Sequence, residues 1–423
     1  MTERRRRGIL ALLAGNGISA LGTRMSMLAI PWFVLTTSGS AAQTGIVAFA
    51  ETAPYVLLMA IGGPWVDRIG AWRVAIASEL VAGLAMGAIP LLHFSGHLSL
   101  PLLAALAAIA GGVRGAGDTG NRVLVPALAE EAVMPLERAS GLFDGISRTA
   151  GMIGVPVAGL LIAATSAPAV IVIDAVSFIV SGAIILALVP RTSQPAPHPE
   201  EAEASYLARL GDGFRHLRGD RLLMGIALMV LVTNLIDAAN ASVLMPLWGS
   251  ERLGSPVGIG LISGVFGLGA VLGNAVLAWL APQLPRRLVY GIGFLIGGSP
   301  RFAVAAVSWT VEPMLAIAFV AGFGAGSINP ILGAVEYERV PRHLQARVLG
   351  AIGALAWAGI PFGGILGGAL AEAAGLATAL WIAAGIYFLT TLIPFVFPVW
   401  REMDRRPATA IGTDRGLAGQ ESG

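Results

Sequence analysis

The sequence predicts an all-α membrane protein in which twelve transmembrane helices form two pseudo-symmetric six-helix bundles. Composition is the first observation: 56% of the 423 residues are hydrophobic and 12% are charged, about half the charged fraction of a soluble protein. The second is that apolar residues fall in runs of about 20, the length that crosses about 30 Å of hydrocarbon as a helix. The third is a polar interval in mid-chain, with six such runs on either side.

Each apolar run predicts one span. In the first half we expect spans at about 9–37, 44–65, 72–92, 100–121, 139–164 and 167–190. In the second half we expect them at about 222–248, 257–280, 287–308, 312–334, 347–370 and 376–399. The first run continues past Pro31 without an Ala-x-Ala-like cleavage site, so we expect a first span and not a removable signal peptide.

The polar interval divides the chain into predicted parts: a bundle at 1–190, a cytoplasmic linker at 191–221, a bundle at 222–400 and a disordered cytoplasmic tail at 401–423. Inside the linker, Gln194 to Glu203 is rich in Pro, Glu and Ala and predicts a mobile segment. Apolar residues then recur at helical spacing among arginines, which predicts an amphipathic helix lying on an anionic membrane surface. These residues are Leu207, Leu210, Phe214 and Leu217.

Loop arginines predict the orientation of the spans. They gather in the loops on one side, including Arg4 to Arg7 and the central linker, whereas the opposite loops hold a single one, Arg252. The excess of basic residues marks the cytoplasmic side. We therefore expect a multi-pass protein of the inner (plasma) membrane with both termini in the cytoplasm, which requires an even number of spans.

Absent residue types exclude several functions. All 27 basic residues are Arg, and a Walker A loop ends in Gly-Lys-[Ser/Thr], so no ATP-binding motif of that type is present. The chain has no Cys, which excludes disulfides and thiolate metal sites. His93 and His97 lack a third ligand nearby, so we expect no metal site. The arginines flank spans rather than forming a soluble basic face, which argues against a nucleic-acid partner. We expect no cofactor.

The two halves repeat in sequence. Pro31, Gly39, Ser40 and Gly45 recur half a chain later, in the same order, as Pro246, Gly254, Ser255 and Gly260. A second cluster, Gly154, Pro156 and Gly159, recurs as Gly359, Pro361 and Gly364. Both halves start on the same side and contain six spans, so the repeat is parallel, which is the arrangement of major facilitator transporters.

The loop after the second span carries a specific motif: Gly63, Asp67, Arg68, Gly70 and Arg73, spaced as Gly-x-x-x-Asp-Arg-x-Gly-x-x-Arg. It resembles the signature loop of the major facilitator superfamily, although Ala71 and Trp72 replace the basic pair that usually follows. The resemblance covers nearly the whole chain and implies the major facilitator fold. It also implies that this loop acts as a gating motif that holds the two halves in one conformation.

The fifth span contains Gly151, Pro156 and Gly159. They resemble the Gly-x-x-x-Gly-Pro-x-x-Gly-Gly motif of proton-coupled drug antiporters, with Val155 and Leu160 in place of two glycines. A Pro removes one helix hydrogen bond and a small neighbour lets another helix approach the kink, which suits a pliable gate. The overall pattern is similar to the bacterial drug-efflux branch that includes macrolide and siderophore exporters.

Charges inside spans are costly in lipid and usually face a cavity or a partner. The fourth span carries Arg114, Asp118 and Arg122 along one helical stripe, so we expect Asp118 to be an ionised member of a structural ion-pair network. Arg114 also resembles the Arg of the fourth span in proton-coupled facilitators. Asp144 and Arg148 are spaced as another i, i+4 pair near the cytoplasmic end.

A proton carrier should be a buried acid without a permanent cation on its own helix turn. Glu51, Asp174 and Asp237 meet that test and are the proton-coupling candidates, the alternative being that they are hydrogen-bonded structural groups. Arg24 lies at a depth from which its side chain reaches toward Glu51, and such a pair would switch on protonation.

These observations predict a secondary transporter, not an enzyme, whose partners are a small-molecule substrate, the proton and the lipid bilayer. The family resemblance implies alternating access and a substrate site between the halves, lined by spans one, four, seven and ten. We expect proton-driven export of hydrophobic or amphipathic small molecules such as antibiotics. Two alternatives stay open: an importer or uniporter of a small metabolite, and a non-transporting membrane receptor or scaffold.

Overall fold

The computed structural model of the chain describes residues 2–191, 206–280 and 284–405, and twelve helical segments within them are long and apolar enough to cross a membrane. The predicted mobile segment at Gln194 to Glu203 and most of the predicted tail lie outside this part. Large apolar side chains such as Leu84, Leu91 and Leu389 are exposed on its outer surface, as expected for a surface that meets lipid. The all-α membrane fold is confirmed.

The first six spans are nearly unbroken helices. They are α1 (Thr2–Ser38), α2 (Ala41–Ile61), α4 (Ala71–Phe94), α5 (Leu100–Glu131), α6 (Leu136–Ala164) and α7 (Ala167–Leu188), with the short α3 (Gly63–Ile69) between α2 and α4. Side-chain caps begin two of them: the hydroxyl of Ser40 accepts from Gln43 N (3.2 Å) and that of Ser166 accepts from Ala169 N (3.3 Å). Such caps satisfy backbone donors that a helix start leaves free.

The second six spans are more interrupted. After α9 (Tyr206–Gly219), the seventh span runs through α10 (Arg221–Ala239), η1 (Asn240–Leu244), α11 (Met245–Trp248) and η2 (Gly249–Leu253), and the eighth is α12 (Val257–Leu280). The ninth to eleventh are paired segments: α13 (Arg286–Gly297) with α14 (Ser299–Val307), α15 (Val311–Gly326) with α16 (Ile328–Arg339), and α17 (Gln345–Ala358) with α18 (Ile360–Ala374). The turn η3 (Arg342–Leu344) precedes α17, and the chain ends with α19 (Leu376–Val396) and η4 (Pro398–Asp404).

Proline explains the paired segments. Pro300, Pro330 and Pro361 lie in the first turn after each break, where the missing N–H of Pro costs least. At the first break, a Cβ on Gly298 would overlap the ring of Tyr387, so only Gly permits this approach. The break between α13 and α14 matters for the site, because Arg301 follows it directly.

The internal repeat is visible in the backbone. Gly39 and Gly254 are matched positions that follow the first span of each half, and both have left-handed backbone angles, with φ of 68° and 61°. Glycine adopts such angles without steric cost. The two halves therefore reuse the same turn after their first span.

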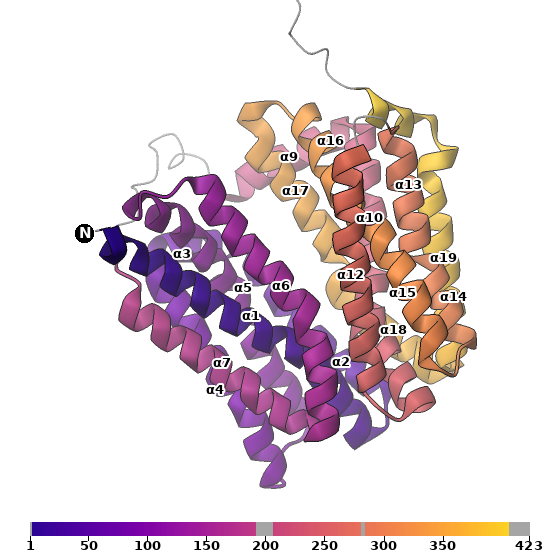
Figure 1. Cartoon of the computed structure of the whole chain (residues 1–423), viewed down its shortest axis with the longest axis horizontal. Coiled ribbons are helices and arrows are strands. Elements are labelled where there is room, and N and C mark those ends of the chain that lie inside the picture. The colour runs from indigo at the N-terminus through magenta and orange to yellow at the C-terminus, as the bar shows by residue number, and fades with distance from the viewer. Residues whose placement is uncertain (1, 192–205, 281–283, 406–423) are drawn as a thin grey trace, which may run out of the picture.

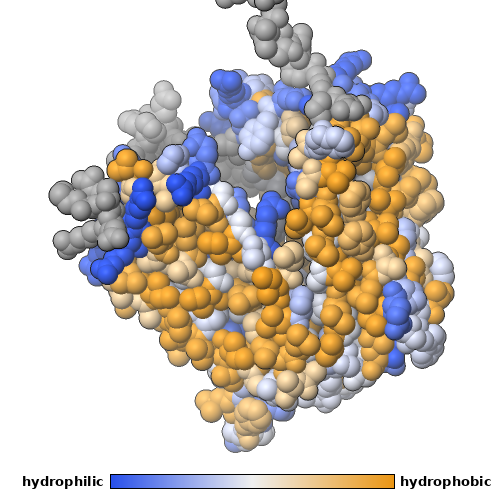
Figure 2. All heavy atoms as spheres, viewed as in Figure 1, coloured by the Kyte–Doolittle hydropathy of each residue, from blue (hydrophilic) through white to orange (hydrophobic). Residues whose placement is uncertain are grey.

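The two six-helix bundles have separate cores that meet at one end. Helices α1 to α7 form one bundle and α10 to α19 the other; they touch near α2 and α18 and diverge toward the end where α1 begins and α9 lies (Figure 1). Only a few core residues cross over: Leu35 and Ala41 join the second core, and Ile259 joins the first. On the face drawn in Figure 2, hydrophobic residues cover much of both bundles, and a recess between the bundles opens at the divergent end.

Helix α9 packs against protein on its apolar side. Leu217 is fully buried in a cluster with Leu223 and Val348, and Asp212 forms an ion pair with Arg347 of α17 (3.6 Å). Of the apolar face that we expected to lie on the membrane surface, Phe214 and Leu217 therefore pack against apolar side chains of α17 and the start of α10.

Candidate functional site

A cavity of about 1490 Å³ lies between the two bundles. Side chains of α1, α5, α10 and α15, the predicted first, fourth, seventh and tenth spans, contribute to its walls, as do α2, α6, α12 and α18. Met27, Met152 and Phe266 provide apolar surface, while Glu51, Arg114 and others provide charge. Cavities of this mixed character bind small molecules.

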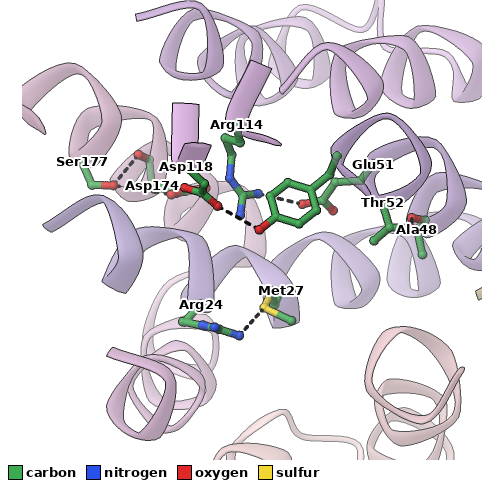
Figure 3. A network of polar contacts seen from close by, with 10 residues as sticks. Arg24, Met27, Ala48, Glu51, Thr52, Arg114, Asp118, Asp174 and Ser177 are labelled. Carbon is green, nitrogen blue, oxygen red and sulfur yellow. Dashed lines mark hydrogen bonds and ion pairs between the residues drawn. The ribbon is translucent and has the colours of Figure 1, made fainter. Parts of the chain in front are cut away.

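The first bundle places an ion pair and a hydrogen bond in the cavity wall (Figure 3). Arg114 of α5 pairs with Glu51 of α2, with Nη1 and Oε1 3.3 Å apart, and both side chains are about one-fifth exposed. The hydroxyl of Tyr55 donates to Asp118 at 2.8 Å, and the guanidinium of Arg114 lies 5.6 Å from the Tyr55 ring centre. Glu51 and Asp118 are thus held by groups from the facing helix.

The pairing within this network differs from the sequence prediction. Within the described residues Asp118 forms no ion pair with Arg114 or Arg122; instead Arg122 approaches Asp144 of α6 at 3.8 Å. Because Arg122 approaches Asp144, the predicted pair between Asp144 and Arg148 is wrong. An i, i+4 spacing places two side chains on one helix face, but a partner on the neighbouring helix can lie closer.

Arg24 does not reach Glu51, whose partner is Arg114. The Arg24 Nη1 group instead donates to the sulfur of Met27 at 3.5 Å (Figure 3). The predicted Arg24–Glu51 pair is therefore not formed in this conformation, because Arg114 lies directly across from Glu51 on α5.

Asp174 lies behind the cavity, between α7 and α1. It is 1% exposed, and Ser177 Oγ donates to its backbone carbonyl at 2.8 Å and contacts its Oδ1 at 3.5 Å. Gly22 of α1 faces it, and a Cβ at that position would lie 2.6 Å from Asp174 Oδ1. The close approach of α1 to α7 therefore encloses this carboxyl among packed helices.

In the second bundle Asp237 of α10 forms an ion pair with Arg301 of α14. Arg301 also lies over the ring of Phe302, with 4.9 Å from its Cζ to the ring centre. The sequence analysis did not single out Arg301, although an Arg within the apolar run of the ninth span was a visible signal. Asp237 has no cation on its own helix turn, but a cation reaches it from another helix.

Glu79 is a second site residue that sequence reasoning missed. It lies within α4, is 7% exposed and lines the cavity, and its Oε2 makes no hydrogen bond within the described residues. Its signal in the sequence was an acidic residue within the third predicted span. Together with Glu51, Asp118 and Asp237, it makes four carboxyl groups that border the cavity.

The gating motif folds into α3 and the turn that follows. Val66 is fully buried, while Asp67, Arg68 and Arg73 are exposed at the divergent end of the bundles, and Gly70 adopts a φ of 98° that favours glycine. In the described part of the chain no ion pair joins Asp67 or Arg68 to the second bundle. The two halves are apart where this loop lies.

The fifth-span motif lies where α6 crosses α12 of the other bundle. A Cβ at Gly159 would be 2.7 Å from the Pro256 carbonyl, and one at Gly264 would be 3.1 Å from the Pro156 ring. Gly151 lies further along α6, beside Arg24, and a Cβ there would be 3.7 Å from Arg24 Nε. Small residues thus allow two backbones to meet across the interface.

Hydrogen bonds also join the two bundles at the end of the cavity where α2 and α18 touch. The Oε2 atom of Glu372, near the end of α18, accepts from Ser40 Oγ at 3.1 Å and from the backbone N–H of Ala42 at 3.2 Å. Both donors belong to the start of α2 in the other bundle. A carboxylate at a helix N-terminus is favoured by the helix dipole.

Comparison with known proteins connects this architecture to transport. The chain is 30% identical to the multidrug efflux pump Tap of Mycobacterium tuberculosis over 413 residues, covering 96% of this chain and 97% of the pump. It is 28% identical to the pump of the same name from Mycolicibacterium fortuitum over 408 residues, covering 96% and 99%.

Solved structures share the fold. The nucleoside transporter NupG superimposes with a TM-score of 0.73 at 15% identity, over 92% of this chain and 99% of that one. An inward-facing, unoccupied bacterial homologue of the human lysosomal transporter Spinster gives 0.70 at 14% identity, over 96% and 99%. Residues 12–257 and 228–419 match the sequence model of the Major Facilitator Superfamily. With twelve spans, a parallel repeat and a cavity between its halves, this chain is a membrane transporter that belongs to the Major Facilitator Superfamily.

Proposed function

We propose that this transporter exports hydrophobic or amphipathic small molecules, driven by proton entry, from the inner membrane with both termini in the cytoplasm. The central cavity carries the proposal, because it joins apolar walls to acid–arginine pairs that span different helices. The 30% identity to multidrug efflux pumps supports the direction and the class of cargo.

The geometry of the two ends supports a mechanism of alternating access. The bundles are apart at the end that carries α9 and are joined at the other end by small residues and by Glu372. With the loop arginines in the cytoplasm, this conformation is open to the cytoplasm. We propose that the gating loop around Asp67 and Arg68 joins the halves when this end closes.

Proton coupling is assigned to Glu51 and Asp237, with Asp174 as a third candidate within the first bundle. Protonation of Glu51 or Asp237 removes the charge that holds Arg114 or Arg301 to a neighbouring helix. The freed arginine then changes the charge of the cavity and the packing between two helices. Each charge moved across 100 mV of membrane potential contributes about 2.3 kcal/mol to the conformational change.

Everted membrane vesicles test direction and coupling together. An imposed inside-acid gradient should drive a fluorescent amphipathic dye into vesicles that contain the protein, and Asp237→Asn and Glu51→Gln should abolish the gradient-driven part. Glu137→Gln, which changes an exposed acid in the first turn of α6 outside the cavity, serves as the matched control. Uptake that ignores the gradient would identify a uniporter, and gradient-driven movement in the reverse direction an importer.

A further inference from the structure

We propose that the cavity contains a binding subsite for an anionic group, formed by Arg24 and Arg148, and that the cargo is therefore an amphiphilic anion or zwitterion. This inference rests on the proposed transport of small molecules through the cavity and adds the chemical class of the cargo. It comes from the two cavity arginines that lack a carboxylate partner among the described residues.

Arg24 is a cation in the middle of a membrane-spanning helix with no ion pair in the described part of the chain. It lines the cavity, is exposed to it, and its head contacts the sulfur of Met27 at 3.5 Å, a weak acceptor. Asp118 is bound instead by the Tyr55 hydroxyl. Figure 3 shows the Arg24 guanidinium apart from the carboxylates of this network.

Arg148 lines the same region from α6. The carboxylate one turn before it, Asp144, is engaged by Arg122 at 3.8 Å, so Arg148 keeps no ion pair within the described residues. Gly151 lies near both arginines. It is one turn beyond Arg148 on α6, and a Cβ at Gly151 would be 3.7 Å from Arg24 Nε. The head of Arg24 thus rests on α6 about one turn from Arg148.

The other arginines that line the cavity differ from this pair. Arg114, Arg122 and Arg301 each have a carboxylate partner: Glu51, Asp144 and Asp237. A cation among apolar walls is costly unless an anion compensates it. Because the described part of the chain supplies no carboxylate partner here, we infer that the cargo does.

The chemistry of the wall defines that partner. The planar guanidinium fork binds carboxylate, sulfonate or phosphate groups with paired hydrogen bonds. Met27 and Met152, also in the cavity wall, offer flexible apolar surface to the rest of the molecule. A compact anionic group on an apolar body fits both features.

Equilibrium binding of a matched acid and amide tests the subsite. The full-length protein in nanodiscs of zwitterionic lipid is given radiolabelled naphthaleneacetic acid or naphthaleneacetamide, which share one apolar body. Charge-assisted hydrogen bonds should make the acid bind about ten- to a hundredfold more tightly. Arg24→Gln should remove most of that preference while leaving amide binding unchanged, and Arg148→Gln should reduce it in the same sense.

Arg138→Gln is the control for net charge. Arg138 is exposed near the start of α6 and does not line the cavity, so its loss changes the protein's charge equally but should keep the acid preference. Arg24→Lys, which retains a point charge, should keep part of the preference for the acid over the amide. This variant replaces Arg24→Gln in the test if Arg24→Gln does not fold. Loss of acid binding on adding anionic lipid would identify a lipid headgroup as the source of the anion.

Equal binding of acid and amide by the unaltered protein, or no binding of either, overturns the subsite. So does an equal loss of both ligands in Arg24→Gln, which would mark Arg24 as structural. The assay contains no proton gradient, so acid-selective binding without gradient-driven vesicle uptake would refute proton-coupled export and leave the anion subsite standing.

Discussion

Removing Arg301 should destabilise the second bundle more than neutralising its partner Asp237. In the ion pair the Arg301 side chain is 18% exposed and that of Asp237 is 40% exposed. Losing one partner of a fully buried pair costs about 3–5 kcal/mol, whereas an exposed pair contributes about 0–1 kcal/mol. The intermediate exposure places the loss for Arg301→Gln at about 1–3 kcal/mol, including the cation–π contact with Phe302, worth about 0.5–1 kcal/mol.

Asp237→Asn should cost less, because Arg301 keeps its ring contacts and the amide oxygen of the new side chain can still accept a hydrogen bond from the guanidinium. The double variant Asp237→Asn/Arg301→Gln removes the stranded carboxylate and should be no less stable than Arg301→Gln alone. Melting temperatures of the four purified proteins in one detergent give the ranking. If the effects of the two single substitutions simply add in the double variant, the residues are not coupled and the ion-pair argument is refuted.

Three further substitutions test the closed end and the ninth span. Glu372→Ala removes two hydrogen bonds between bundles and should shift the population away from this conformation about three- to tenfold, at about 1 kcal/mol; spin-label distances across that end measure it, and an unchanged distribution contradicts it. Gly45→Ala places a methyl group against the Gly364 carbonyl of the other bundle and should therefore increase the labelling of a single cysteine introduced nearby. The chain has no native Cys, so only the introduced residue is labelled. Gly298→Ala overlaps the Tyr387 ring and should lower the melting temperature by the equivalent of about 1–3 kcal/mol; a wild-type value would show that the α13–α14 break is not constrained by this contact.

The sequence predicted the fold well and the charge pairing poorly, for one reason. Spans follow from local hydropathy, so the twelve apolar runs already contained the topology. Ion pairs depend on which helices face each other. Asp144 therefore pairs with Arg122 of α5 rather than with Arg148 on its own helix.

Asp237 shows the same limit. Its own helix turn offers no cation, which marked it as a free acid, yet the break after Gly297 brings Arg301 to it from the ninth span. Glu79 and Arg301 were readable as charges inside spans, but only their positions on the cavity wall distinguish them from packing residues.

By itself the sequence determined that this chain lies in a membrane, that it has two repeated halves of six spans, and which families its motifs resemble. These properties depend on local hydrophobicity and on the order of residues, so they can be predicted without knowing which distant residues are in contact. The tertiary structure alone decided which end of the bundles is open, which acids have arginine partners, and which two arginines are left without one. Those facts depend on distances between helices far apart in the chain, and no local pattern encodes them.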